Sequence, residues 1–366
     1  MKGITRKSNF ELMRILSMLF IVLFHFTLHG GVYSSCDNKL LKGVLDILIC
    51  MSLVHVNSYI LITGYFQSES KFKQKKVWKL INQTWFYRLV IVLFLILTDR
   101  LVLSKVELLQ ETAIVNLTEY WYAKIFLIVY IISPYLNKLI KGFSKKEYKR
   151  FIIILFVLLS IMPFITNGLF YKNDGFGIVH FIFLYFVGGY LKKYPFKTKK
   201  SKTKIRLIYI STFFVCVLLN IILSDLLVKY YGINSITKAI GDIFINNKIN
   251  YSNPIIIIQT ISYFCFFGTL DIKSKLINKI SETSFAVYLI HDNQLLKEYI
   301  YKFFKLGEKV TQFSYLFYLL GVVFVAFVAG CIIEKIRIIV FQKIYNMKFF
   351  EKIRAKYYSY IEKINI

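Results

Sequence analysis

Long apolar runs most constrain what this chain can fold into. Ten can be marked, most of them roughly 18 to 25 residues long, which is about the length a helix needs to cross ~30 Å of hydrocarbon. The mean hydropathy of +0.56 over 366 residues agrees with this pattern. We therefore predict an all-α polytopic membrane bundle of about ten transmembrane helices, at approximately 10–28, 41–66, 84–103, 120–140, 151–169, 177–191, 205–228, 252–270, 281–300 and 312–334.

The charge pattern predicts how these spans are oriented. The formal net charge is +28, and the Lys and Arg residues lie in short clusters between the apolar runs. Such clusters are typical of orientation signals and of attraction to anionic lipid, and they give no support to nucleic-acid binding. The more basic connections alternate along the chain, beginning with the N-terminus. This alternation favours an even number of spans with both termini in the cytoplasm.

The domain organisation expected from the sequence is simple. Residues 1–336 would form one ten-helix membrane domain. The remainder, 337–366, mixes Lys and Arg with aromatic residues at helical spacing. That composition predicts a basic amphipathic tail on an anionic membrane surface.

Three polar residues interrupt the first apolar run: Glu11, Arg14 and His25. Arg14 and His25 are eleven residues apart, which is three helical turns plus about 20°, so they share a face roughly 16 Å apart along the axis. Glu11 precedes Arg14 at the i,i+3 spacing where opposite charges meet. Arg14 could snorkel to the interface beside Glu11, or it could bind an anion. A histidine in the outer half of a span needs a polar partner and is suited to proton transfer.

Other polar residues are further candidates. His55 and Asn57 in the second span suggest an inward face around a cavity, although packing polarity would explain them equally well. His291 and Asp292 lie near the outer end of the ninth span, and their spacing of about 100° argues against a dyad facing one target. A basic patch before and inside the third span could orient the protein or hold phosphates; it includes Lys75, Lys76, Lys79 and Arg88.

Several segments together resemble the acyltransferase 3 family of membrane O-acyltransferases. The Arg-x10-His spacing of Arg14 and His25 resembles that family's first-span signature. "YILITGYF", "YWYAKIFLIVYIISPYLNKLI", "HFIFLYFVGGYLKKY" and "ISETSFAVYLIHDN" are similar to later segments of the family and occur in the same order. The similarity is greatest to the branch of capsule and exopolysaccharide O-acetyltransferases. Many members have two arginines four positions apart before the third span, where this chain has lysines and then Arg88.

This resemblance implies an enzyme of the bacterial cytoplasmic membrane. It would transfer an acyl group, usually acetyl, from cytoplasmic acyl-CoA to a hydroxyl of a saccharide or lipid-linked saccharide. Acetyl-CoA would be the acyl donor, and no metal is expected. His25 and Arg14 would be critical, with Glu11 and His291 as further catalytic candidates. Lys75, Lys76, Lys79 and Arg88 would contact the donor.

Two other classes of protein remain compatible with the sequence. A transporter or flippase of polysaccharide precursors would also have about ten spans with buried polar groups, although the chain shows no internal repeat of the kind found in many transporters. A polysaccharide polymerase would share the aromatic-rich spans, but we would expect a larger extracytoplasmic loop.

Overall fold

The structure is a computed structural model that describes residues 7–113, 120–169, 171–195, 201–308 and 310–345. Over these ranges the chain is helical, with no β structure beyond an isolated bridge between Cys36 and Val310. The helices are α1 (Ser8–Leu28), α2 (Lys39–Ser52), α3 (His55–Gln67), α4 (Gln74–Leu97), α5 (Lys105–Thr112), α6 (Trp121–Gly142), α7 (Lys145–Phe156), the π-helical η1 (Val157–Ile161), α8 (Met162–Ile165), α9 (Ile178–Lys193), α10 (Lys202–Lys229), α11 (Ser235–Asn246), α12 (Pro254–Gly268), α13 (Lys275–His291), α14 (Lys297–Phe303) and α15 (Ser314–Tyr345). The predicted all-α class is confirmed for the described residues.

Seven helical stretches in the described ranges are long and apolar enough to cross a membrane. They are Ser8–Leu28, Lys39–Gln67, Gln74–Leu97, Trp121–Gly142, Lys145–Ile165, Lys202–Leu223 and Ser314–Gln342. Three further spans were expected, and these regions contain α9, α12 and α13, with 16, 15 and 17 residues. The total of ten therefore stays a prediction.

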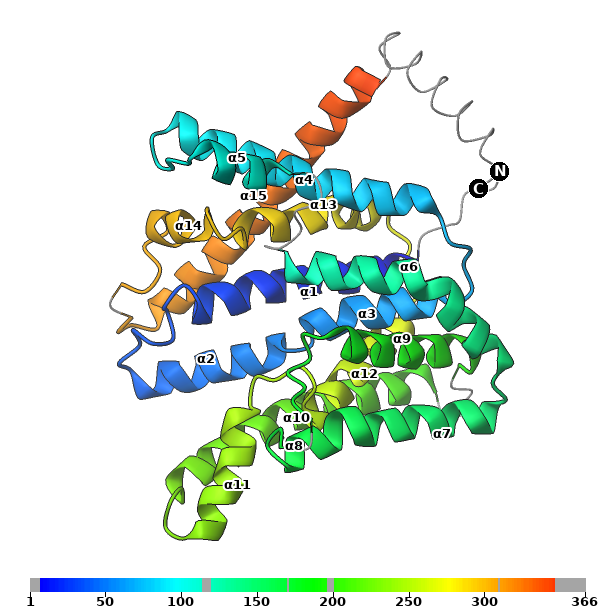
Figure 1. Ribbon diagram of the computed structural model, residues 1–366. Helices are drawn as coiled ribbons and strands as arrows, with labels where there is room; N and C mark the ends of the chain where they lie inside the picture. The colour runs from blue at the N-terminus through cyan, green and yellow to red at the C-terminus, as the bar shows by residue number, and fades with distance from the viewer. Residues whose placement is uncertain (1–6, 114–119, 170, 196–200, 309, 346–366) are drawn as a thin grey trace.

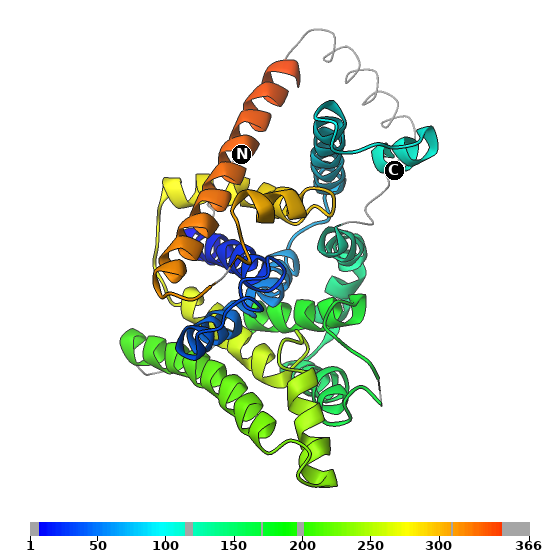
Figure 2. The same cartoon turned by 90° about the vertical axis from the view of Figure 1, so that its left-hand side faces the viewer.

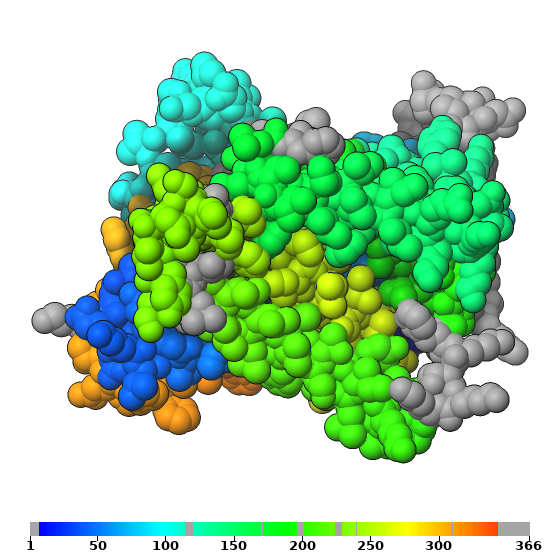
Figure 3. Space-filling view, turned by 90° about the horizontal axis from the view of Figure 1, so that it is seen from below, coloured from blue at the N-terminus to red at the C-terminus, as the bar shows by residue number. Residues whose placement is uncertain are grey.

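Most of the long helices lie roughly side by side, with α1 near the middle of the bundle, whereas α15 runs obliquely across them (Figures 1 and 2). Helix α1 packs against α13, α15, α2, α3 and α12. Seen from below, α12 in yellow is visible between the greens of its neighbours (Figure 3). Because α1 is central, polar side chains along its whole length lie inside the bundle.

Two glycines bring the backbones of α3 and α9 close together. A Cβ atom at Gly64 would collide with the carbonyl oxygen of Tyr185, and one at Gly188 would collide with that of Leu61. Small residues permit such close approach of helices in membranes. This contact fixes α3, which carries several cavity residues, against α9.

Element boundaries differ from the expected ones in three places. Helix α4 begins at Gln74 rather than near residue 84, so the three candidate lysines lie in its first two turns. The expected ninth span is broken, because α13 ends at His291 and α14 begins only at Lys297. Helix α15 continues through the expected domain boundary at residues 336 and 337. Within the predicted tail, residues 346–366 lie outside the described residues.

Candidate active site

His25 and His291 meet where two helices end. His25 lies in the last turn of α1, and His291 is the last residue of α13. The Nδ1 atom of His25 is 3.1 Å from Nε2 of His291, and both side chains are buried. Two residues 266 positions apart in the sequence thus form one hydrogen-bonded pair.

The hydrogen bonds determine which nitrogen carries each proton when both rings are neutral. Nδ1 of His291 is 2.6 Å from the carbonyl oxygen of Val287 and must donate to it, since a carbonyl oxygen only accepts. Nε2 of His291 is then an acceptor, and Nδ1 of His25 donates to it. The remaining nitrogen, Nε2 of His25, carries a free lone pair.

Asp292 joins this pair. Its Oδ1 atom lies 3.4 Å from Nδ1 of His25, and the residue is 7% exposed. The expectation that His291 and Asp292 could not face one target is wrong. Asp292 is the C-cap of α13, where the backbone leaves helical geometry, so the 100° spacing no longer applies.

The cluster lies beside a large cavity of about 1020 Å³. Asp292 and three histidines line it: His25 and His29 from the end of α1, and His55 from the start of α3. Residues within three segments at one end of the bundle also line it; these segments are 167–169 with 172–176, 246–251 and 294–297. We call this space the large cavity.

His55 has a fixed orientation in the wall of the large cavity. Its Nδ1 atom donates to the carbonyl oxygen of Ser52, at the end of α2, just before α3 begins. Nε2 of His55 therefore accepts from the hydroxyl of Tyr251, at 3.0 Å. His55 thus has both nitrogens engaged, whereas His25 has one nitrogen left for a reactant.

A second hollow of about 180 Å³ lies toward the other end of α1, α3 and α6. We call it the small pocket. Arg14 and Lys76 supply its positive charge, and Gln67, Ser70 and Tyr130 supply polar groups. Two cations in one pocket suit an anionic or phosphate-bearing ligand.

One layer of side chains separates the two hollows. In each of three helices, a residue of the small pocket lies one turn from a residue of the large cavity: Arg14 and Met18 in α1, Thr63 and Tyr59 in α3, and Phe126 and Tyr122 in α6. The rings of Tyr59 and Tyr122 are 6.1 Å apart, and the hydroxyl of Tyr59 donates to the main-chain oxygen of Arg14 at 2.8 Å. Because one helical turn is 5.4 Å, the partition is only about one side chain thick.

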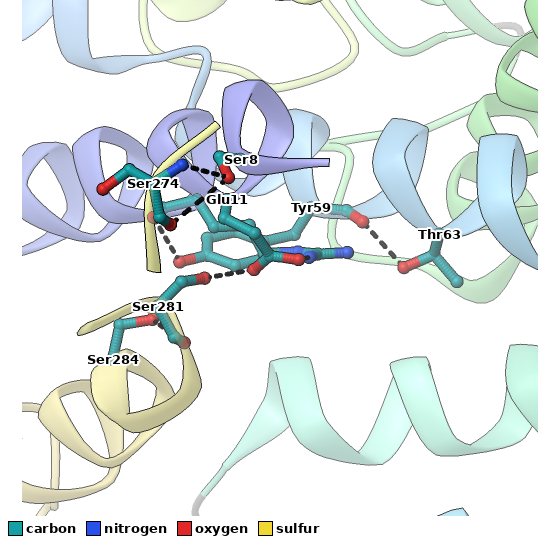
Figure 4. Close-up of polar contacts among 8 residues, drawn as sticks. Ser8, Glu11, Tyr59, Thr63, Ser274, Ser281 and Ser284 are labelled. Atoms are coloured by element: carbon teal, nitrogen blue, oxygen red, sulfur yellow. Dashed lines mark hydrogen bonds and ion pairs between the residues drawn. The ribbon is translucent and has the colours of Figure 1, made fainter. Parts of the chain in front are cut away.

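Glu11 pairs with Arg14 as the spacing predicted. Its Oε1 accepts from the Arg14 guanidinium and its Oε2 from the hydroxyl of Ser281, both at 2.5 Å. A neighbouring pair of bonds joins Ser8 to Ser274 (Figure 4). Glu11 lines neither hollow; its two bonds fasten α1 to the first half of α13 and hold Arg14 in place.

The remaining candidates for donor contacts are placed unequally. All three lysines are exposed, but only Lys76 lines the small pocket, and Lys75 and Lys79 line neither hollow. Arg88 is 2% exposed in the middle of α4 and forms an ion pair with Glu111 at 2.5 Å. The structure therefore brings only Lys76 together with Arg14.

Sequence reasoning missed several of the cavity residues. Tyr59 and Tyr122 were not candidates, because aromatic residues in apolar spans resemble ordinary packing residues. Asp292 was not a candidate, because in a continuous helix it would point about 100° away from His291. Had the sequence predicted that the helix ends at His291, Asp292 would have been a candidate as well. In the part of the chain that the structure describes, no group of three or more His, Cys, Asp or Glu side chains could hold a metal ion.

Comparison with known proteins gives one match. A family model described as an acyltransferase domain, of the acyltransferase 3 group, matches residues 7–334. That range contains both hollows and the histidine pair. No curated protein and no solved structure matches this chain significantly.

Proposed function

Since this chain belongs to the acyltransferase 3 family and is a membrane acyltransferase, we propose that it moves an acetyl group from cytoplasmic acetyl-CoA to a hydroxyl of a cell-surface saccharide. The observation that carries this proposal is the free Nε2 of His25, in the wall of the large cavity. A basic nitrogen held beside a cavity is what deprotonation of an acceptor hydroxyl requires.

In the proposed reaction, His25 acts as general base. Its Nε2 accepts the proton of the hydroxyl while that oxygen attacks the thioester carbonyl. The new C–O bond forms and the C–S bond breaks, and the imidazolium then returns its proton to the leaving thiolate. His291 and the Asp292 carboxylate face Nδ1 of His25, so they stabilise the positive charge that forms on the ring.

A second route uses the same atom. Nε2 of His25 attacks the thioester carbonyl; the N–C bond forms, the C–S bond breaks, and CoA leaves as the thiolate. The saccharide hydroxyl then attacks the acyl-imidazolium, the C–N bond breaks, and the hydroxyl proton passes to the thiolate. Both routes need the lone pair of Nε2 and the same hydrogen bond at Nδ1. They differ in that only the second forms a covalent enzyme intermediate.

The donor would enter from the small pocket. We assign phosphate contacts of acyl-CoA to Arg14 and Lys76, with Lys75 and Lys79 adding positive charge nearby on α4. Arg88 is engaged with Glu111, so we assign it no donor contact. The pantetheine arm would pass the layer of Tyr59 and Tyr122 to bring the thioester to His25, roughly 16 Å from Arg14.

This proposal requires an oriented membrane protein. We place it in the bacterial cytoplasmic membrane with ten spans, both termini in the cytoplasm, and basic connections against anionic lipid. The small pocket then faces the cytoplasm, where acyl-CoA is available, and the large cavity faces outward. The saccharide, free or lipid-linked, would enter there.

The test is acetyl transfer by the purified protein in lipid nanodiscs. Release of CoA thiol and acetylation of the host's surface glycan are measured for the wild type and for His25→Ala. We expect a loss of about 10²- to 10⁴-fold, the usual contribution of a general base. Full retention of transfer would overturn the proposal, and saccharide movement without CoA release would favour a transporter.

A matched control is His180→Gln. His180 is a buried histidine whose Nε2 contacts the Asn57 Oδ1 atom at 3.0 Å, and it lines neither hollow. Glutamine retains a donor for that contact. We expect near-normal transfer by this variant, which separates loss of a reactive histidine from loss of folding.

A further inference from the structure

Six aromatic and histidine rings follow one another along the wall of the large cavity. They are Trp121, Phe176, Tyr251, His55, Phe24 and His25. Successive ring centroids are 4.7, 5.1, 5.3, 5.2 and 6.0 Å apart. We call this row the ring track. It joins the segments at the rim of the cavity to the proposed base.

Exposure is greatest at Phe176, which is 48% exposed. The four rings that follow it, Tyr251, His55, Phe24 and His25, are each at most 9% exposed. A phenylalanine half exposed beside a cavity loses the benefit of burial unless a ligand covers it. The track therefore has an exposed apolar ring, Phe176, near its start and a buried base, His25, at its end.

Polar groups accompany the rings. Asn167, Asn246 and Gln294 line the same cavity from three different segments. Amide side chains both donate and accept hydrogen bonds, as hydroxyl groups do. Apolar ring faces together with such polar groups fit a sugar, which has C–H faces and hydroxyl edges.

We propose that the ring track is an extended acceptor site for a saccharide of two or more sugar residues. This inference rests on the proposed function and specifies its acceptor. One sugar ring covers about one aromatic ring, and four rings lie between Trp121 and His25. The volume of about 1020 Å³ also lies at the upper end of the range for small-molecule sites. A single sugar would fill only a small part of this volume.

The experiment uses the full-length protein in nanodiscs and two readouts. The probe is the surface glycan of the producing cells, partially hydrolysed and size-fractionated into pieces of one to six sugar residues. Calorimetry measures binding of each fraction, and CoA release measures transfer. We expect kcat/KM to rise at least tenfold from one residue to three or four and then to level off.

The informative variant is Phe176→Ala, because this side chain is exposed at the rim and its loss should not prevent folding. We expect the KM for the longer fractions to rise at least tenfold, with kcat and the KM for acetyl-CoA little changed. Phe176→Tyr keeps the ring and should restore binding. Tyr171→Ala, in the same segment but outside the cavity lining, should behave as wild type.

The two readouts separate the possible failures. Binding of the long fractions without CoA release would overturn the acetyl transfer and leave the track standing. CoA release with no dependence on saccharide length, or with an unchanged acceptor KM in Phe176→Ala, would overturn the track. Tighter binding of a fatty acid than of any saccharide fraction would assign the cavity to a lipid and would also overturn it.

Discussion

The tautomer of His25 depends on residues far away in the sequence. A carbonyl at Val287 determines the tautomer of His291, and His291 then determines which nitrogen of His25 is free. Asp292 lies near the same Nδ1 atom. The reactive nitrogen is thus selected by α13, although it belongs to α1.

Asp292→Asn tests this arrangement. The amide cannot offset the positive charge that develops on His25, so we expect kcat to fall by about one to two orders of magnitude with little change in either KM. The measurement is steady-state CoA release. Asp271→Asn removes an exposed carboxylate that pairs with Lys202 and should leave kcat unchanged. Equal kcat values for wild type and Asp292→Asn would remove Asp292 from the mechanism.

The pair of Glu11 and Arg14 combines a structural role with a proposed binding role. Arg14→Ala removes the guanidinium that pairs with the 7%-exposed Glu11, which keeps its bond to Ser281. We expect a loss of about 1–3 kcal/mol in stability, less than for a fully buried pair because Arg14 is 28% exposed. Adding Glu11→Gln should recover part of it.

Thermal unfolding and the KM for acetyl-CoA, measured on the same variants, separate these roles. If Arg14 binds the donor, the double variant regains thermal stability but keeps a raised KM. A KM that recovers together with stability would show that Arg14 acts only through Glu11.

At the scale of the helix, the contact between α3 and α9 leaves no room for side chains larger than glycine at Gly64 and Gly188. Gly64→Ala or Gly188→Ala forces a methyl group into a facing backbone oxygen, so we expect a loss of about 1–3 kcal/mol or more. Gly321→Ala in α15 is the matched control, since nothing lies within 4 Å of its added Cβ. That change should be neutral or stabilise the helix by up to about 1 kcal/mol. Thermal melting curves in detergent compare the stability of the three variants with that of the wild type.

The sequence was informative about helices and less so about where they end. Apolar runs predicted the long helices, because a helix surrounded by lipid or by other helices has apolar side chains over most of its surface. Helix α4 begins earlier than predicted because its lysine-rich first turns are polar but still helical. The end of α13 at His291 was not visible, since "IHDN" carries no glycine or proline. That missed end hid the proximity of Asp292 to His25.

At the scale of the whole molecule, the walls of the large cavity constrain the topology. The end of α1 and segments 167–176, 246–251 and 294–297 all line it, so they lie at the same end of the bundle. Between one of these segments and the next along the sequence, the chain passes to the other end of the bundle and returns. Helices α9, α10, α12 and α13 make these passages, although three of them are short. Charge counting along the sequence predicts that such passages alternate between the two sides of the membrane, and this stays a prediction.

Ten passages and seven spans place particular residues on different sides of the membrane. If α9 and α12 cross, Lys172 and Lys238 lie outside while Lys145 and Lys273 lie in the cytoplasm. If only the seven longest stretches cross, Lys238 moves to the cytoplasm and the other three do not. Single cysteines at these exposed positions, in a chain with its five natural cysteines replaced, can be probed on intact cells with a membrane-impermeant maleimide.

We expect labelling of Lys172→Cys and Lys238→Cys, and protection of Lys145→Cys and Lys273→Cys until the cells are opened. Protection of Lys238→Cys with labelling of Lys172→Cys would contradict ten passages. It would also separate segment 246–251 from segment 167–176 by the bilayer, although both line one cavity. The position of Lys238 therefore tests the topology and the acceptor site in one measurement, because a saccharide can reach Tyr251 and His25 together only if both face the same side.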